Sequence, residues 1–478
     1  MATLPVAIEC EPVHASSGTL VVTDRPIWAI SASRTILIAT LFLGALAFGA
    51  VQAWAWALTS ILAAGSLLLG AWPAVERGRA RIRWSPLYLP AVIFLLIGIL
   101  QFELGLSADG VATREALVKL STDIVIFVLA CQLWQDSSPR DLRRLGFTIS
   151  VFACGLALFG TLQFFASPGT IYGVVRPRWG GWIFGPYVNH NHYAGLMEML
   201  IPVALGYVLS HMQAQRKSAV IDRRYSAGLL VRSLGPLAIM IAAASVLLSG
   251  SRGGMISLAV EAVLFTTMIA RFMPEARRRR LIIAAIAGAA ASAALFLWLD
   301  PSRISQRLGA VANLPQAPEA TLGERIELAR DALGIFRAHP WLGTGFGSFA
   351  SVYPRYRSFA SDLEWDHAHD DYVEVLAETG IGGGIAILAA IGLFLAGAFS
   401  RLRERLHQDG GWIRLGAAIG CCGLLVHSFG DFNLHIPANA AWFAFFAGIA
   451  VCPDGLRSAG AYGRWSSEKP GFVHTTTR

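Results

Sequence analysis

Histidines and aspartates crowd into one short stretch of this sequence, DHAHDDYVEVLAETGIGGG, which runs from Asp366 to Gly384. Histidine accepts a proton near neutral pH, and a neighbouring carboxylate orients its ring and stabilises its charged form. His369, followed directly by Asp370, therefore has the equipment of a general base. The residues after it recur at helical spacing, which predicts that His369 lies in the first turn of a helix.

The same stretch allows two other interpretations. His367 and His369 with the neighbouring aspartates could coordinate a metal ion, but the H-x-H-D-D spacing matches no strong zinc pattern. The groups could also serve the structure alone. We predict base chemistry, with no metal and no cofactor.

Two arginines are candidates for binding phosphate. Arg252 stands between glycines in LLSGSRGGMISL, where backbone and ligand can approach closely. Arg325 belongs to a predicted short amphipathic helix, lying on or near a membrane, whose start is marked by the capping-box pair Thr321 and Glu324. The planar guanidinium fork suits phosphate oxygens. The alternative for Arg252 is an arginine that reaches from an apolar span to lipid headgroups.

A glycine-rich segment, GTGFG, follows this predicted helix at 343–347. A phosphate-binding loop needs a preceding strand and a following GK[ST], and this segment has neither. We therefore predict a turn that allows close packing.

Further polar groups lie at the borders of apolar stretches, in GPYVNHNHYAGLMEMLIP (185–202) and HSFGDFNLHIPANA (427–440). Ionisable residues inside a membrane normally face protein or water rather than lipid. The groups singled out are Asn191, Glu198, His427, Asp431 and His435. They are site candidates, members of a polar interhelical network, or the ion and proton carriers of a transporter.

The composition predicts that transmembrane helices position these groups. Of the 478 residues, 55% are hydrophobic and 15% are charged, and the mean hydropathy is +0.53, values that indicate a polytopic membrane protein. A transmembrane helix needs about 20 apolar residues. Stretches near this length lie at 35–51, 53–74, 86–104, 120–135, 145–168, 192–211, 233–249, 255–270, 281–299, 380–400, 412–430 and 434–452. We expect an all-α fold of about twelve transmembrane helices.

The distribution of Lys and Arg orients these helices, because cytoplasmic loops collect positive charge. With the N-terminus inside, 27 of the 39 basic residues fall in cytoplasmic segments, five in short outer loops and seven in one long outer loop. Both termini are therefore expected in the cytoplasm. The net charge of +8 is an orientation signal rather than a sign of nucleic-acid binding, because the basic residues are dispersed.

This topology divides the chain into five parts. A cytoplasmic tail (1–34) precedes nine transmembrane helices (35–299). A long periplasmic loop containing short helices (300–370) leads to a helix start that faces the periplasm and to the last three transmembrane helices (371–452). A second cytoplasmic tail (453–478) follows.

The chain resembles the bacterial O-antigen ligase family, which includes Wzy-type polysaccharide polymerases and protein O-oligosaccharyltransferases. The likeness covers 35–452 and is most specific over 321–384. The family motif, a histidine and a small polar residue, nine residues and then Gly-x-x-[Gly/Thr/Tyr], is met by His369, Asp370, Gly380 and Gly383. The motif's second position, here an aspartate, usually carries Asn, Ser or Gln. SRGG at 251–254 is similar to the family's outer-face arginine segment.

The resemblance implies a GT-C-like architecture in the bacterial inner membrane. It also implies glycan transfer on the periplasmic face, from an undecaprenyl diphosphate donor to a hydroxyl of a glycan, a lipid A core or a protein, without metal or nucleotide. His369 would be the base of an inverting displacement, and Arg252 and Arg325 would hold the diphosphate. Supporting candidates are Asp370, Glu198, Asn191, Asp431 and His435. The choice among ligase, polymerase and protein glycosylation stays open, and a transporter is the alternative from another class.

Overall fold

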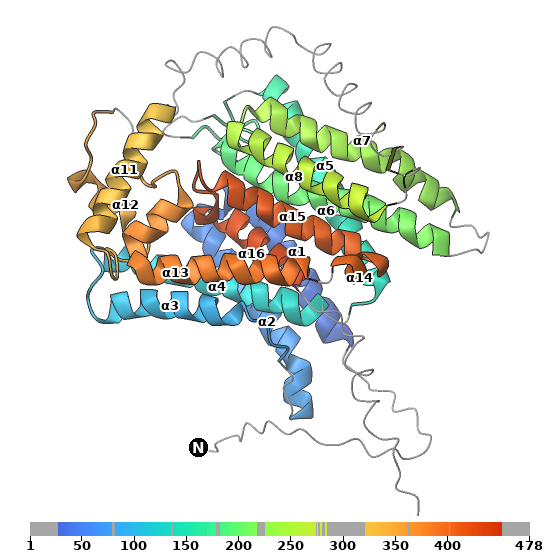
Figure 1. Cartoon of the computed structure of the whole chain (residues 1–478), viewed down its shortest axis with the longest axis horizontal. Helices are drawn as coiled ribbons and strands as arrows, with labels where there is room; N and C mark the ends of the chain where they lie inside the picture. The colour runs from blue at the N-terminus through green and yellow to red at the C-terminus, as the bar shows by residue number, and fades with distance from the viewer. Residues whose placement is uncertain are drawn as a thin grey trace, which may run out of the picture.

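The chain folds into a bundle of packed α-helices (Figure 1). The computed structural model describes residues 27–451 with gaps at 79–81, 135–136, 168, 178–181, 218–224, 274, 276–277, 280–282, 284–320, 362–363 and 401. The main helices are α1 (Ile27–Leu46), α2 (Ala53–Arg77), α3 (Tyr88–Glu103), α4 (Gly110–Trp134), α5 (Pro139–Ala166), α6 (His190–Lys217), α7 (Tyr225–Ser249), α8 (Arg252–Phe272), α11 (Leu322–Ala338), α12 (Phe349–Val352), α13 (Asp371–Phe399), α14 (Leu402–His407), α15 (Gly411–His427) and α16 (Pro437–Val451). Apart from two isolated β-bridges, these described residues form no β-structure, and the all-α prediction is confirmed.

Seven described helices are long and apolar enough to cross a membrane, namely α1, α2, α4, α5, α6, α8 and α13. Four shorter apolar helices, α3, the second half of α7, α15 and α16, join them. These helices coincide with eleven of the predicted apolar stretches. The twelfth, at 281–299, lies outside the described residues except for position 283. The polytopic membrane fold is therefore confirmed, and the number of twelve spans stays a prediction.

Several helices begin well before the apolar stretch that predicted them. The stretches start at 35, 120 and 380, whereas α1, α4 and α13 begin at Ile27, Gly110 and Asp371. The reason is that hydropathy detects only the apolar part of a helix, while caps and local hydrogen bonds set its ends. At α13 the cap is the side chain of Asp370, which accepts from two backbone amides of the first turn.

Helix α6 is the centre of the bundle. Of its apolar window, 94% is buried, against 22% for α13, so that α13 presents much more of its surface to the surroundings. The contact between α6 and α15 is close because glycines lie at it. A Cβ on Gly206 would lie 2.2 Å from the carbonyl oxygen of Trp412, and one on Gly416 would lie 2.3 Å from that of Pro202.

The part of the long loop that the structure describes packs at one end of the bundle, on the left in Figure 1. The predicted amphipathic helix is present as α11, and its capping box between Thr321 and Glu324 is formed. Its apolar face, with Leu328, Ala332 and Ile335, is covered by residues of the same loop and the start of α13. This face therefore stabilises the loop. Leu322 and Ile326 of the same helix are exposed, and contact of α11 with a membrane stays a prediction.

The glycine-rich segment forms the predicted turn. Gly343, Gly345 and Gly347 all have positive φ (65°, 117° and 80°), a conformation that favours glycine. A Cβ on Gly343 would lie 2.2 Å from the backbone of Glu378. The Glu378 carboxylate accepts from the amides of Gly347 (2.8 Å) and Phe349 (2.9 Å). The loop is thus fixed to α13.

Candidate functional site

His369 lies directly before α13, not in its first turn as the spacing predicted. Asp370 is the N-cap, and its side chain accepts from the amides of Tyr372 (3.0 Å) and Val373 (3.1 Å). His369 itself has φ +52°, which no helical residue adopts. The prediction fails because the aspartate competes for the helix terminus, a place that aspartate, asparagine and serine favour. The aspartate in the motif therefore keeps a capping role that Asn or Ser also performs.

The carboxylate that faces His369 comes from another part of the chain. His369 Nδ1 lies 3.5 Å from Asp431 Oδ1, and His192 Nε2 lies 3.7 Å from the same oxygen. Asp431 is fully buried in the connection between α15 and α16, whereas the side chain of His369 is 17% exposed. His369 thus has a buried carboxylate, Asp431, as its partner and a side chain that a ligand can reach.

Aromatic rings complete the surroundings of His369. Phe432 presents its ring to His369 (centroids 4.8 Å apart), to His192 (4.7 Å) and to His367 (4.4 Å, stacked). Trp365 meets His369 edge to face at 5.7 Å. Sequence reasoning missed Phe432 and did not select His192, although NHNH had marked the segment that carries it.

Asp431 is held in its charged form. Burial by itself raises the pKa of a carboxyl group. The nearby imidazoles of His192 and His369 and the positive charge of Arg325 outweigh this and hold the pKa of Asp431 well below its usual range. An ionised, enclosed carboxylate beside His369 stabilises the imidazolium that base catalysis creates.

A second cluster joins the start of α13 to the segment before α16. Asp371 Oδ1 and His435 Nδ1 are 2.7 Å apart, and Glu374 Oε1 lies 3.3 Å from His435 Nε2 and 2.7 Å from His367 Nδ1. Burial lowers the pKa of His435, but Glu374 and Asp371 outweigh it and raise that pKa to about 10. His435 therefore carries a positive charge between two carboxylates.

This second cluster also contains the residues best placed to hold a metal. His367, Glu374 and His435 each offer one ligand atom, and these atoms lie within 4.8 Å of one another. His369 is not in that group. The three side chains already pair with one another, so the arrangement needs no ion to neutralise it. The expectation of a metal-independent protein stays untested.

Glu198 forms a third pair. Its carboxylate lies 3.0 Å and 3.2 Å from Nδ1 of His427, and both side chains are buried between α6 and α15. The His427 ring packs against the start of α8, because a Cβ on Gly253 would lie 2.3 Å from its Nε2. The pair thus supports the backbone next to Arg252.

Both predicted arginines lie at this end of the bundle. Arg252 is exposed and is the first residue of α8, whose N-cap is Ser251. Arg325 extends from α11 and donates to the carbonyl of Gly430, next to Asp431. Asn191 is buried in the first turn of α6, and its amide donates to the side chain of Asn189 (2.8 Å). The described candidates thus gather where α6, α8, α11, α13, α15 and α16 meet.

The two glycines of the motif, Gly380 and Gly383, lie in α13, which follows His369. Gly380 has φ +65° and ψ −162°, a break inside α13. A Cβ there would lie 2.5 Å from the backbone of Trp341, and the next amide, of Ile381, donates to Pro340 (2.8 Å). A Cβ on Gly383 would overlap the side chain of Thr379. Gly380 thus lets the long loop cross α13 at van der Waals distance, whereas Gly383 leaves room for Thr379 of the same helix.

Comparison with known families decides the assignment. Residues 237–388 match the family model Wzy_C, described as O-antigen ligase. The chain carries an O-antigen ligase domain. The match supports assignment to the O-antigen ligase family and indicates an enzyme of the ligase or glycosyltransferase type, with a lipid-linked glycan and an acceptor as its general partners. No curated protein matches the chain.

The O-antigen ligase domain supplies only part of the site. Arg252, Arg325 and His369 lie inside the matched residues. Asp431, which faces His369, and His192, which faces Asp431, come from outside the match. The other polar candidates outside the match are Glu198 on α6 and His427 and His435 in the α15–α16 region. Helices on both sides of the O-antigen ligase domain therefore enclose its histidine.

Proposed function

We propose that the protein is a glycosyltransferase of the bacterial inner membrane with its active site facing the periplasm. It moves a glycan from an undecaprenyl diphosphate donor to an acceptor hydroxyl of a glycan, a lipid A core or a protein, and it uses no metal or other cofactor. The observation that carries this proposal is the approach of His369 to the buried, ionised Asp431 at the edge of an O-antigen ligase domain.

His369 acts as the general base. With Nδ1 directed at Asp431, Nε2 carries the lone pair that takes the proton of the acceptor hydroxyl. The acceptor oxygen bonds to the anomeric carbon while the bond from that carbon to the diphosphate breaks, and the diphosphate leaves with the electron pair. Because this is one displacement, the configuration at the carbon inverts. Asp431 stabilises the imidazolium that remains.

Arg252 and Arg325 bind the diphosphate. Negative charge grows on the leaving oxygens during the displacement, and guanidinium groups that meet it lower the barrier. Arg252 supports this role because it is exposed at the start of α8. Arg325 supports this role because, from α11, it reaches Gly430, the residue next to Asp431. Glu198 and His427, together with His435, Asp370 and Asn191, hold the surrounding backbone.

The O-antigen ligase domain favours transfer over transport. A transporter would use Glu198, His427 and Asp431 to carry ions or protons. Glu198 and His427 pair with each other, and Asp431 faces two histidines. All three groups therefore have partners that the transfer mechanism explains.

The test is glycan transfer by the purified protein in detergent, with a lipid-linked glycan donor. His369→Ala should abolish transfer and leave membrane insertion and donor binding intact, because it removes a proton acceptor rather than an anchor. His367→Ala should be milder. Transfer should persist in EDTA. A His369→Ala protein that still transfers would contradict the base, and EDTA inactivation rescued by a divalent metal would favour a metal at His367, Glu374 and His435.

A further inference from the structure

A long apolar cavity lies between four helices, next to the segment that carries His367 and His369. Helix α3 contacts α4 and α13, and α16 also contacts α4 and α13. The four helices line a partly open cavity of about 480 Å³, within the range of roughly 300–1,000 Å³ found for ligand pockets. Protein interiors are otherwise close-packed. A void of this size therefore calls for an occupant.

The cavity is elongated along the helices. On α4 its lining runs from Ala112 to Phe127, which at 1.5 Å per residue is about 22 Å. On α13 it runs from Asp371 to Phe394. Space along this length comes from small side chains, since Ala116, Ala390 and several other alanines line it. Such a shape suits an extended hydrocarbon chain.

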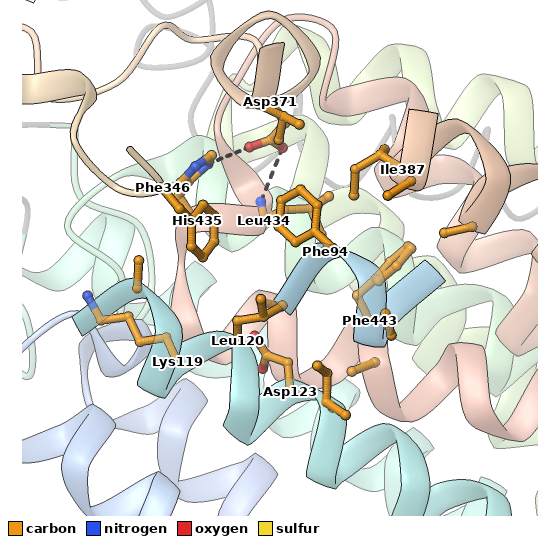
Figure 2. A pocket seen from close by; sticks show the side chains of 18 of the residues that line it. Phe94, Lys119, Leu120, Asp123, Phe346, Asp371, Ile387, Leu434, His435 and Phe443 are labelled. Carbon is orange, nitrogen blue, oxygen red and sulfur yellow. Dashed lines mark hydrogen bonds and ion pairs between the residues drawn. The ribbon is translucent and has the colours of Figure 1, made fainter. Parts of the chain in front are cut away.

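One end of the cavity is polar and belongs to the second histidine cluster. Figure 2 shows His435 and Asp371 paired at this end, with the apolar rings of Phe94 and Phe443 farther along the wall. Deep in the cavity the carboxyl group of Asp123 faces the apolar space, and it suits a hydrocarbon neighbour only in its neutral form. An amphiphile would place its headgroup at His435 and its chain along α4.

The polar end lies close to the proposed base. Phe432 stacks on His367, which lines the cavity, and presents the same ring to His369. One aromatic ring thus lies between the cavity and the histidine that takes the acceptor's proton.

The chemistry of the polar end distinguishes acceptor from donor. Asp371 lines this end, and Glu374 lies behind His435, so two carboxylates surround the one charged imidazole of His435. The excess of negative charge suits hydroxyl groups, which donate hydrogen bonds to carboxylates, better than phosphate. The arginines suited to a diphosphate come from α8 and α11, outside these four helices. Lys119, the lysine among the described lining residues, already lies 4.0 Å from Glu115.

From this geometry, and resting on the proposed function, we infer that the cavity between α3, α4, α13 and α16 binds the hydrocarbon chain of a lipid-linked acceptor, with its sugar hydroxyls at the His367–His435 end. The protein would therefore glycosylate an amphiphile rather than a water-soluble protein. Donor and acceptor would approach His369 from opposite sides.

The test uses a hexadecyl glucoside that carries a photoreactive diazirine in its chain, added to the full-length protein in lipid nanodiscs. Wild-type protein should be labelled on α4, α13 or α16, as mapped by mass spectrometry of peptides. Ala390→Phe, which fills the cavity, should reduce this labelling several-fold. Ala389→Phe is the matched control, because Ala389 is exposed on the other face of α13, and it should label like wild type. Equal labelling of the two variants, or labelling elsewhere, would overturn the cavity assignment.

Two further measurements separate the acceptor from the donor. Unlabelled hexadecyl glucoside should displace the probe better than farnesyl diphosphate, and the reverse order would assign the cavity to the donor and overturn the inference. In the transfer assay Ala390→Phe should raise KM for a lipid-linked acceptor and leave KM for the donor unchanged. Absence of transfer by the wild-type protein would reject the proposed function, whereas transfer equally efficient in both phenylalanine variants would reject the acceptor cavity alone.

Discussion

At the end of the bundle that carries α11, carboxylates accept hydrogen bonds from backbone amides, and at the opposite end arginines donate to backbone carbonyls. Glu378 and Glu374 accept from the amides of 347, 349 and 368. Arg405 donates to the carbonyl of Ala450 (3.1 Å), and Arg414 donates to those of Ile449 (2.8 Å) and Trp134 (3.2 Å). These carbonyls lie at the C-terminal ends of helices, where partial negative charge gathers.

The difference lies in what else each charge meets. At the α11 end, hereafter the carboxylate end, the carboxylates also pair with histidines, whose charge changes near neutral pH. Among the described atoms there, His369 Nδ1 and Asp431 Oδ2 lack a hydrogen bond of ordinary geometry. Arginine keeps its charge at all physiological pH values. The carboxylate end is thus equipped for proton transfer, and the arginine end fixes helix termini in place.

The difference between the two ends requires that they face different compartments, and this can be tested directly. In a protein lacking its native cysteines, Ser358→Cys at the carboxylate end should react with an impermeant thiol reagent in intact spheroplasts. Ser400→Cys at the arginine end should react only after lysis. Both serines are exposed. Labelling in the reverse pattern would overturn the orientation and the mechanism with it.

At the carboxylate end, Asp431→Asn should lower kcat for glycan transfer by on the order of 10²-fold or more, since the amide cannot stabilise the imidazolium of His369. KM for the donor should change little. The measurement is steady-state transfer at equal protein abundance. A variant with normal kcat would remove Asp431 from the mechanism.

The arginines of the carboxylate end should differ from those of the other end in their response to lysine. Arg252→Lys and Arg325→Lys should both impair transfer, because an ammonium keeps the charge and loses the bidentate fork. Alanine at either position should cost on the order of 10²-fold. Full transfer by both alanine variants would exclude these residues from diphosphate binding.

Arg414→Met at the arginine end should affect stability and not chemistry. It leaves buried carbonyls of α4 and α16 without their charged donor, at a cost of roughly 2–5 kcal/mol. Thermal unfolding in detergent should show the loss, while transfer per folded molecule stays at the wild-type level. Reduced transfer by fully folded protein would show that the two ends are coupled.

The smallest effect concerns pH. The pKa of His435 is raised to about 10 by Glu374 and Asp371 despite its burial, so its stabilising contribution is complete below the unfolded pKa of about 6.5 and is lost as pH rises through about 10. Wild-type protein should therefore lose more thermal stability between pH 7 and pH 10 than His435→Gln does. Parallel pH profiles would contradict a charged His435.

The helices were predictable from sequence because membrane insertion imposes a strong apolar signal, and the start of α11 was predictable because Thr321 and Glu324 interact locally. The partner of His369 was not, because the adjacent aspartate caps the helix and Asp431 approaches from the α15–α16 connection. The pair of Asp371 and His435 was equally unpredictable, because these residues are 64 positions apart in the sequence. Local spacing identifies the groups that titrate, whereas packing between distant helices decides their pairs.

The enclosure of α6 has a consequence for biosynthesis. The ribosome completes His190–Lys217 long before Gly411–His427, the helix that packs most closely on it. Until α15 arrives, Glu198 has no histidine to neutralise it, and an unpaired carboxylate in hydrocarbon is costly. The nascent chain therefore passes through a waiting stage in which water or the insertion machinery covers the polar face of α6, and its assembly ends with the docking of a late helix into an early one.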